Sequence, residues 1–167
     1  MSLERRDDGD MPRTDSASRE FTAPPEEVYA ALVDPVALVV WLPPTGMSGR
    51  FDHYDARPGG SYRMVLTYAD PATGAGKATA DSDVVEAEFV EIVPGRRVVQ
   101  DVDFVSDDPR FRGTMTMTWE VTPVDNGTRV DVRADDVPIG ISAEDHVTGL
   151  ASSLENLAVY LGSRGRD

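Results

Sequence analysis

Segment 111–122, which reads FRGTMTMTWEVT, constrains the fold more than any other stretch, because apolar and polar residues alternate along it. A period of two places two methionines and Trp119 on one face of a strand and the threonines on the other. Such a strand covers a core with one face and meets water with the other. Asn126 and Gly127 follow and predict a tight hairpin into a second strand at 128–134. We therefore expect an antiparallel sheet that is buried on one side.

Similar alternation recurs upstream, and helical spacing appears near both ends of the chain. In 84–93 the alternation slips once near Phe89, which predicts a β-bulge. Segment 24–34 predicts a helix, because its prolines fall in the first turn and acidic residues follow them. Segment 142–161 predicts a longer helix that Ser142 caps. The apolar stripe of this helix consists of Val147, Leu150, Leu154, Leu157, Ala158 and Leu161. Further strands are predicted at 16–23, 47–54, 61–68 and 96–105, and a second short helix at 36–42.

The order of these elements indicates an α+β fold, because the run of strands is kept apart from the helices. We expect a curved antiparallel sheet of six or seven strands wrapped around the long C-terminal helix, with the two short helices after the first strand. Residues 16–162 are assigned to a single domain, 1–15 to a disordered N-terminal arm and 163–167 to a tail. A sheet and a helix of this size need not close completely, so we expect a cavity between them.

Charge and composition exclude several classes of partner. The formal net charge is −14, which would repel a nucleic-acid backbone or an anionic membrane, so we expect neither as a partner. The chain has no cysteine, which rules out disulfides, thiolate catalysis and zinc–thiolate sites. Its two histidines form no metal spacing with carboxylates, and we expect no metal and no cofactor. Without an apolar leader or membrane-length apolar run, the chain is expected to be cytoplasmic.

Several segments together resemble one protein family. DARPGGSYRM at 55–64 matches its D-x-R-x-G-G-x-Y/F-R turn, and Trp41 followed by Pro43 matches its W-x-P element. FTAPPEEVYAALVDPVALVVWLPP is similar to its opening, and GTMTMTWEVTPVDNGTRVDV to its penultimate hairpin. The chain thus resembles the AHSA1-like proteins, homologues of activators of the Hsp90 ATPase, in the Bet v 1-like, START-related (SRPBCC) superfamily. This resemblance covers about residues 16–162 and implies a helix-grip fold with a hydrophobic cavity between the sheet and the C-terminal helix.

The glycine pair at 59–60 could belong to a phosphate-binding loop or to the corner between two strands. A phosphate loop needs its glycines between a strand and a helix, whereas an alternating strand follows this pair. We therefore expect a strand corner in which Gly59 or Gly60 has a positive φ and Asp55 pairs with Arg57. Segment 74–79, GAGKAT, lacks the first glycine and the final Ser or Thr of a nucleotide loop, so we expect no nucleotide site there.

Few polar side chains are expected inside the sheet. His53 shares the predicted inner face with Met47 and Phe51, and we interpret it as a hydrogen-bonded histidine at the core edge, a ligand contact or a weak acid–base group. Gln100, Tyr62 and Tyr68 are the other inner polar residues. Asp101 and Asp103 share one strand face and could serve acid/base chemistry, but we expect them on the solvent face, and His146 is expected to be solvated. Such scarcity favours binding over catalysis.

The leading hypothesis is a binding module that holds a small hydrophobic molecule between sheet and helix. One alternative is an enzyme similar to the polyketide cyclases and aromatases of the superfamily, for which no catalytic residue is assigned. Another is a chaperone- or stress-related protein-interaction module, and a homodimer also stays open. Met115, Met117 and other methionines suit a ligand of variable shape, because their thioethers repack easily. The expected ligand-binding residues are Trp41, Met47, Phe51, His53, Tyr62, Met64, Phe104, Met115, Met117, Trp119, Leu150 and Leu154.

Overall fold

The computed structural model describes residues 13–43, 46–68 and 82–164. Within these ranges one seven-stranded antiparallel sheet has the order β1-β7-β6-β5-β4-β3-β2. Its strands are β1 (Asp15–Phe21), β2 (Met47–Tyr54), β3 (Ser61–Tyr68), β4 (Ser82–Val93), β5 (Arg97–Phe104), β6 (Met115–Val124) and β7 (Gly127–Asp135). The helices are α1 (Pro25–Val33), α2 (Pro35–Trp41), the short 3-10 helix η3 (Pro109–Phe111) and α3 (Ala143–Arg164).

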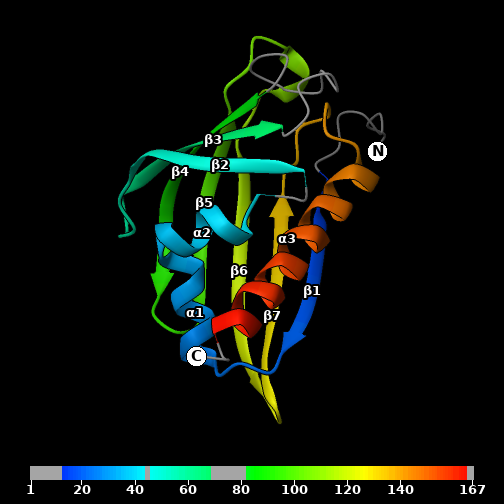
Figure 1. The fold of residues 1–167 in the computed structure, drawn as a ribbon. Coiled ribbons are helices and arrows are strands. Elements are labelled where there is room, and N and C mark those ends of the chain that lie inside the picture. The colour runs from blue at the N-terminus through cyan, green and yellow to red at the C-terminus, as the bar shows by residue number, and fades with distance from the viewer. Residues whose placement is uncertain (1–12, 44–45, 69–81, 165–167) are drawn as a thin grey trace, which may run out of the picture.

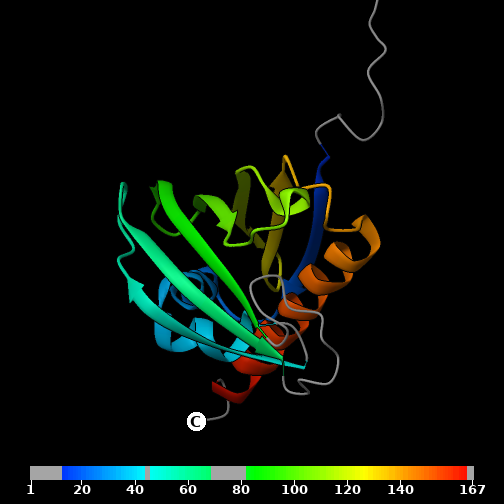
Figure 2. The same ribbon diagram turned by 90° about the horizontal axis from the view of Figure 1, so that it is seen from above.

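The sheet curls around α3, which lies diagonally across β1 and β7, while α1 and α2 lie beside it (Figure 1). Seen from above, the sheet is strongly curled, so that β2 and β3 near one edge run in a different direction from β1 and β7 at the other edge (Figure 2). The expected α+β class and helix-grip arrangement are therefore confirmed. The core occupies the concave, inner face of the sheet, where the apolar residues of each strand meet the helices.

Local sequence accounts for the two short helices. Pro25 and Pro35 each occupy the first turn of a helix, where a missing N–H breaks no bond. Asp34 ends α1 and caps α2, because its carboxylate accepts a hydrogen bond of 2.9 Å from the Val36 amide. The two helices follow one another with one residue between them, which turns the chain back onto the sheet.

The glycine pair forms a strand corner, as predicted. Gly59 has a φ of +83°, and its amide donates a hydrogen bond of 2.8 Å to the carbonyl of Phe89. Gly60 accepts one of 2.8 Å from the Phe89 amide, and a Cβ at Gly60 would lie 2.2 Å from the Asp55 carbonyl oxygen. Arg57 Nε donates to an Asp55 carboxylate oxygen over 2.7 Å. Gly59 is thus favoured by its positive φ and Gly60 by the close approach of the Asp55 carbonyl. The hydrogen bonds to Phe89 hold the corner against β4. Segment 74–79 lies outside the described residues.

Two β-bulges bend the sheet. The register between β4 and β5 shifts between Phe89 and Glu91, which confirms the slip predicted near Phe89. A second shift, between Phe51 and His53, interrupts the pairing of β2 with β3. The sequence did not signal this one, because the residues on either side of it alternate regularly.

The strand predicted at 111–122 begins later than expected. Pro109 to Phe111 form η3, whose first turn is capped by the Asp108 side chain on the Arg110 amide at 3.0 Å. Gly113 then adopts a φ of +100°, so the extended backbone starts only at Met115 and continues to Val124. The proline and its cap outweigh the apparent alternation at the start of the segment.

The outer face of the sheet is polar, as expected. Arg97 Nε donates to Glu120 over 2.9 Å, and Arg63 pairs with Glu86. The Thr114 and Thr116 hydroxyls donate to Asp103 and Asp101 over 2.7 and 2.9 Å. Asp101 and Asp103 therefore belong to the outer face, where threonines of β6 hydrogen-bond them.

Candidate ligand site

The side chains expected around a ligand fall into three groups by burial. Buried are Trp41, Tyr62, Met64, Met115, Trp119, Leu150 and Leu154. Half-buried are Met47, Phe51, Phe104 and Met117. His53 is exposed. The curled sheet and the helices thus bring together the apolar members of the set except Met47, which is not packed against the core, and they leave the histidine outside.

Trp41 and Trp119 form a closely packed part of the interior. Their ring centroids lie 5.7 Å apart at an interplanar angle of 80°, an edge-to-face contact that aromatic pairs favour. The indole of Trp41 also donates a hydrogen bond of 2.9 Å to the Ala31 carbonyl, which ties α2 to α1. Because Trp41 is fully buried and satisfied, its contribution is to hold the helices on the sheet.

An aromatic cluster joins β2, β3 and β4. Tyr54 contacts Phe51, Tyr62 and Phe89, with centroids 4.8 to 5.8 Å away. The Tyr54 hydroxyl donates to the Val33 carbonyl over 2.7 Å, whereas the buried Tyr62 hydroxyl has no hydrogen bond within the described residues. Burial raises the pKa of Tyr54, and it raises that of Tyr62 to about 12. Both phenols are therefore protonated at neutral pH.

Sequence reasoning missed Tyr54 and misplaced His53 for the same reason. The bulge after Phe51 shifts the register, so that His53 pairs with Arg63 and Tyr54 with the inward Tyr62. His53 consequently points to the outer face, where its Nε2 lies 3.1 Å from the Ser61 hydroxyl. The prediction that His53 lies on the inner face is wrong, because one inserted residue reverses the side chains that follow it.

Helix α3 covers the inner face and is anchored to the end of α2. Ser153 donates a hydrogen bond of 2.6 Å to the Leu42 carbonyl, and the Asn156 amide donates one of 3.0 Å to the Pro43 carbonyl. The predicted cap is present, since the Asp145 amide donates to the Ser142 hydroxyl over 3.0 Å. Val147 is 39% exposed, although it was expected on the buried stripe. The apolar stripe of α3 is therefore buried against the inner face of the sheet only from Leu150 onward.

Gln100 is the most unusual polar residue of the inner face. It is 7% exposed, and none of the hydrogen bonds among the described residues involves its carboxamide. Its cross-strand neighbours are Phe89 on β4 and Met117 on β6. Met117 is half-buried even though β6 lies inside the sheet, with β5 and β7 on either side. Gln100 therefore lies beside a part of the inner face that is incompletely covered.

A buried charged cluster ties the first strand to the final helix, and the sequence reasoning did not find it. The side chain of Asp15 is 4% exposed and that of His146 13%. Nδ1 of His146 lies 2.8 Å from Oδ2 of Asp15, and Arg13 Nη2 lies 2.9 Å from the same oxygen. Burial by itself raises the pKa of the Asp15 carboxyl, but the hydrogen bonds from Arg13 and His146 bring it below its ordinary value.

His146 was expected to be solvated, and the structure contradicts this. The helical spacing did contain a signal, because His146 precedes Leu150 and Leu154 at intervals of four and so falls on the same stripe. Its partner, however, comes from the chain's other end. Asp15 belongs to the segment expected to be disordered, of which residues 1–12 lie outside the described residues.

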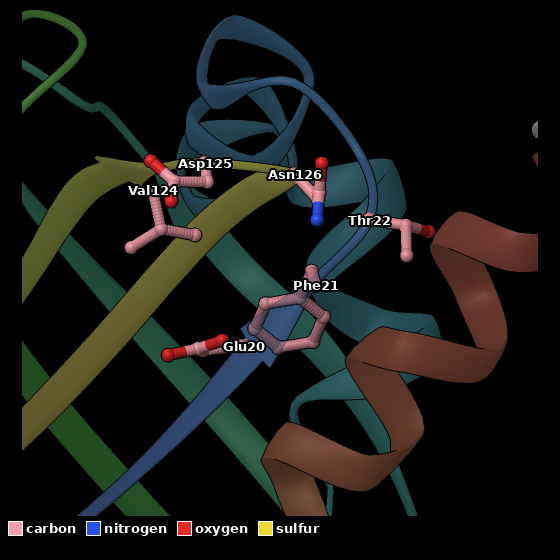
Figure 3. Close-up of a pocket in the computed structure, with 6 residues that line it drawn as sticks. All are labelled: Glu20, Phe21, Thr22, Val124, Asp125 and Asn126. Carbon is pink, nitrogen blue, oxygen red and sulfur yellow. The ribbon is translucent and has the colours of Figure 1, made fainter.

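A shallow hollow lies at the opposite end of the sheet, between the end of β1 and the β6–β7 turn (Figure 3). Its lining contains Phe21 and two acidic side chains, Glu20 and Asp125, and none of the residues expected to hold a ligand. Among the described residues no group of three or more His, Asp or Glu side chains could hold a metal ion. The helices of the described ranges are too short or too polar to cross a membrane.

Comparison with known proteins gives the family. A family model described as Activator of Hsp90 ATPase homolog 1-like protein matches residues 22–162. The chain belongs to this AHSA1 family. The match spans both short helices, the glycine corner, the hairpin and α3, and it confirms the resemblance read from the sequence. A search of curated protein sequences found no match.

Solved structures similar to this AHSA1-family protein share its fold. Protein CV1439 from Chromobacterium violaceum is 32% identical, with a TM-score of 0.77, over 87% of this chain and 94% of that one. The AHSA1 protein from Silicibacter pomeroyi is 21% identical, with a TM-score of 0.75, over 91% and 99%. DynU16, a protein in the dynemicin biosynthetic locus, is 21% identical, with a TM-score of 0.63, over 89% of this chain and 47% of that one. The last two likenesses show the fold alone.

Proposed function

We propose that this AHSA1-family protein binds a small, mostly apolar molecule between the inner face of its sheet and α3. The half-buried state of Met117 carries the proposal. Met117 lies on the inner face of an interior strand, between Gln100 and Ala134, while Met115 and Trp119 on the same face are buried. In a close-packed interior a side chain at such a position would be buried from solvent. A partly exposed side chain there supports the presence of space that a ligand could enter.

Two further half-buried side chains of the inner face are apolar, although one of them, Leu66, pairs across the sheet with the buried Asp83. Leu66 on β3 and Phe104 on β5 are also half-buried and pack against the core. Together with Met117 they would offer an aliphatic, an aromatic and a thioether surface, and the thioether adapts to ligands of different shape. The other end of the interior is filled by Trp41, Leu157 and other fully buried side chains. The ligand is therefore proposed to lie over the part of the sheet that runs from β6 through β5 and β4 to β3.

The expected affinity is modest. Burial of apolar surface contributes about 25 cal/mol per Å², so a ligand that covers about 200 Å² would gain about 5 kcal/mol before association costs. Those costs leave binding in about the micromolar range or weaker. Selectivity would then depend on the few polar groups that the ligand meets.

An enzyme similar to the polyketide cyclases is the second candidate. The likeness to DynU16, which belongs to a biosynthetic locus, is compatible with a small organic ligand, although at 21% identity it shows the fold alone. Gln100 and Tyr62 are inner-face polar groups that such chemistry could use. The third candidate, a protein-interaction module, is disfavoured on the outer sheet face by ion pairs such as Arg97 with Glu120.

Binding of the neutral dye Nile red to natively purified protein tests the proposal. Met117→Trp should weaken dye binding at least about fivefold, because the indole would fill the proposed space. Thr122→Trp, which places the same indole at an exposed outer position of β6, should leave binding unchanged. Equal affinities in all three proteins would contradict the proposal. Mass spectrometry of the same preparation would identify any small molecule that is carried through purification.

A further inference from the structure

Among the residues that the structure describes, Gln100 is the only inner-face position at which a buried amide side chain lies beside an incompletely covered surface. Its carboxamide offers two N–H donors and one acceptor oxygen. Buried groups of this kind are almost always hydrogen-bonded, and one that is left without a partner destabilises the folded state. A buried polar residue that lowers stability and forms no hydrogen bond within the protein indicates a functional role and not a structural one.

The surroundings of Gln100 supply no substitute partner. Its neighbours across the sheet are Phe89 and Met117, and its neighbours along the same face of β5 are Val98 and Val102. All four are apolar, and three of them are buried. The carboxamide thus lies in an apolar environment in which any hydrogen bond that it forms with a ligand would be poorly screened by water.

We propose that the Gln100 carboxamide is the polar anchor of the ligand site and that the ligand is a mostly apolar molecule bearing one neutral hydroxyl or carbonyl group. This inference rests on the proposed function and specifies its ligand. A hydroxyl can donate to the amide oxygen, and a carbonyl can accept from the amide nitrogen. Either bond would satisfy a group that the protein itself leaves unpaired.

The charge of the site favours a neutral ligand over an ionised one. None of the four neighbours of Gln100 is charged, so an ionised group placed there would lose its hydration without gaining an opposite charge. The nearest inner-face carboxylate in the same cross-strand row is Asp15, three strands away, and it is already paired with Arg13 and His146. A carboxylate ligand should therefore bind more weakly than the corresponding alcohol.

Tyr62, the other inner-face polar group without a described hydrogen bond, is less suited to this role. Its ring contacts Phe51, Tyr54 and Phe89, which hold it inside the aromatic cluster. Gln100 adjoins the half-buried Met117 instead. The accessible surface therefore lies next to the amide.

Three probes of equal skeleton test the inference: naphthalene, 2-naphthol and 2-naphthoate, each measured by displacement of Nile red at neutral pH. The wild-type protein should bind 2-naphthol about five- to tenfold more tightly than naphthalene, because one hydrogen bond to a desolvated amide is gained. It should bind 2-naphthoate more weakly than 2-naphthol. Gln100→Met, which keeps the length of the side chain, should remove the preference for 2-naphthol and leave naphthalene binding unchanged or tighter.

The controls separate this inference from the proposed function. Gln100→Leu repeats the test should the methionine variant fold poorly, and both variants should melt at or above the wild-type temperature. Thr118→Val removes a polar group from the outer face of β6 and should change no affinity. Equal binding of naphthalene and 2-naphthol by the wild type is expected if a buried water already satisfies the amide. That result would overturn the role of Gln100 but not the proposed function. The role of Gln100 would also be overturned if Gln100→Met still preferred 2-naphthol to naphthalene, or if the wild type bound 2-naphthoate more tightly than 2-naphthol. Failure of all three probes to bind would overturn the proposed function as well.

Discussion

Nδ1 of His146 lies 2.8 Å from a carboxylate oxygen of Asp15, which joins the first turn of the final helix to the first residue of the first strand. Arg13 approaches the same carboxylate and also donates to the carbonyl of Ile141, just before that helix. A carboxylate can only accept hydrogen bonds, so the proton of this contact belongs to the imidazole nitrogen. The first turn of the helix that covers the inner face is thus held to β1 by contacts around the buried Asp15 carboxylate.

Removal of the Asp15 charge should destabilise the protein. Asp15→Asn leaves Arg13 and His146 without their carboxylate, and we expect a loss of about 2 kcal/mol in the free energy of unfolding. Urea denaturation of the two proteins measures this difference. Asp131→Asn, in an exposed ion pair with Arg129, is the matched control and should change stability little. Similar effects of the two substitutions would show that the buried cluster contributes no more than a surface pair.

The contribution of Asp15 should depend on pH in a defined direction. Its pKa in the folded state lies below the ordinary value of 3.8, because the hydrogen bonds from Arg13 and His146 outweigh the effect of burial. A carboxyl with a lowered pKa binds fewer protons when folded, so its stabilisation is complete above about pH 4 to 5 and is lost as pH falls below the unfolded value. The stability difference between wild type and Asp15→Asn should therefore shrink between pH 5 and pH 3. A difference that stays constant over this interval would contradict the assignment.

Two tyrosines of one cluster should respond oppositely to the same chemical change. Tyr54→Phe removes the donor to the Val33 carbonyl and should cost about 1 to 2 kcal/mol. Tyr62→Phe removes a buried hydroxyl that has no partner within the described residues, so stability should stay the same or rise. Thermal or urea unfolding of the two variants gives the comparison. A larger loss for Tyr62→Phe would reveal a partner for its hydroxyl.

The two glycines of the strand corner should differ in their tolerance of a methyl group. At Gly60 a Cβ would lie 2.2 Å from the Asp55 carbonyl oxygen, so Gly60→Ala should cost at least about 2 kcal/mol. At Gly59 a Cβ meets nothing within 4 Å, and Gly59→Ala should cost only about 1 kcal/mol for its φ of +83°. The midpoints of urea denaturation measure both effects. The opposite order of stability would mean that the corner is held in another conformation.

The sequence by itself determined the fold class and most of the elements. The bounds of β2 and β3 equal the predicted 47–54 and 61–68, because alternation with a period of two is a local property of the chain. The cap at Ser142 was also predicted, and so was the hairpin, although its turn residues are Asp125 and Asn126 and β7 begins at Gly127, one residue earlier than expected. The inner position of Gln100 could also be predicted, since it follows from the alternation of β5.

Only the tertiary structure decided which side chains meet. The bulge after Phe51 depends on the pairing of β2 with β3, and it exchanged His53 for Tyr54 on the inner face. The partner of His146 lies 131 residues away, a distance over which no local pattern acts. The isolation of the Gln100 amide is likewise a property of the neighbouring strands, whose apolar side chains surround it. Periodicity assigns a side chain to a face, whereas its partners and its access to a ligand follow from strand register and packing.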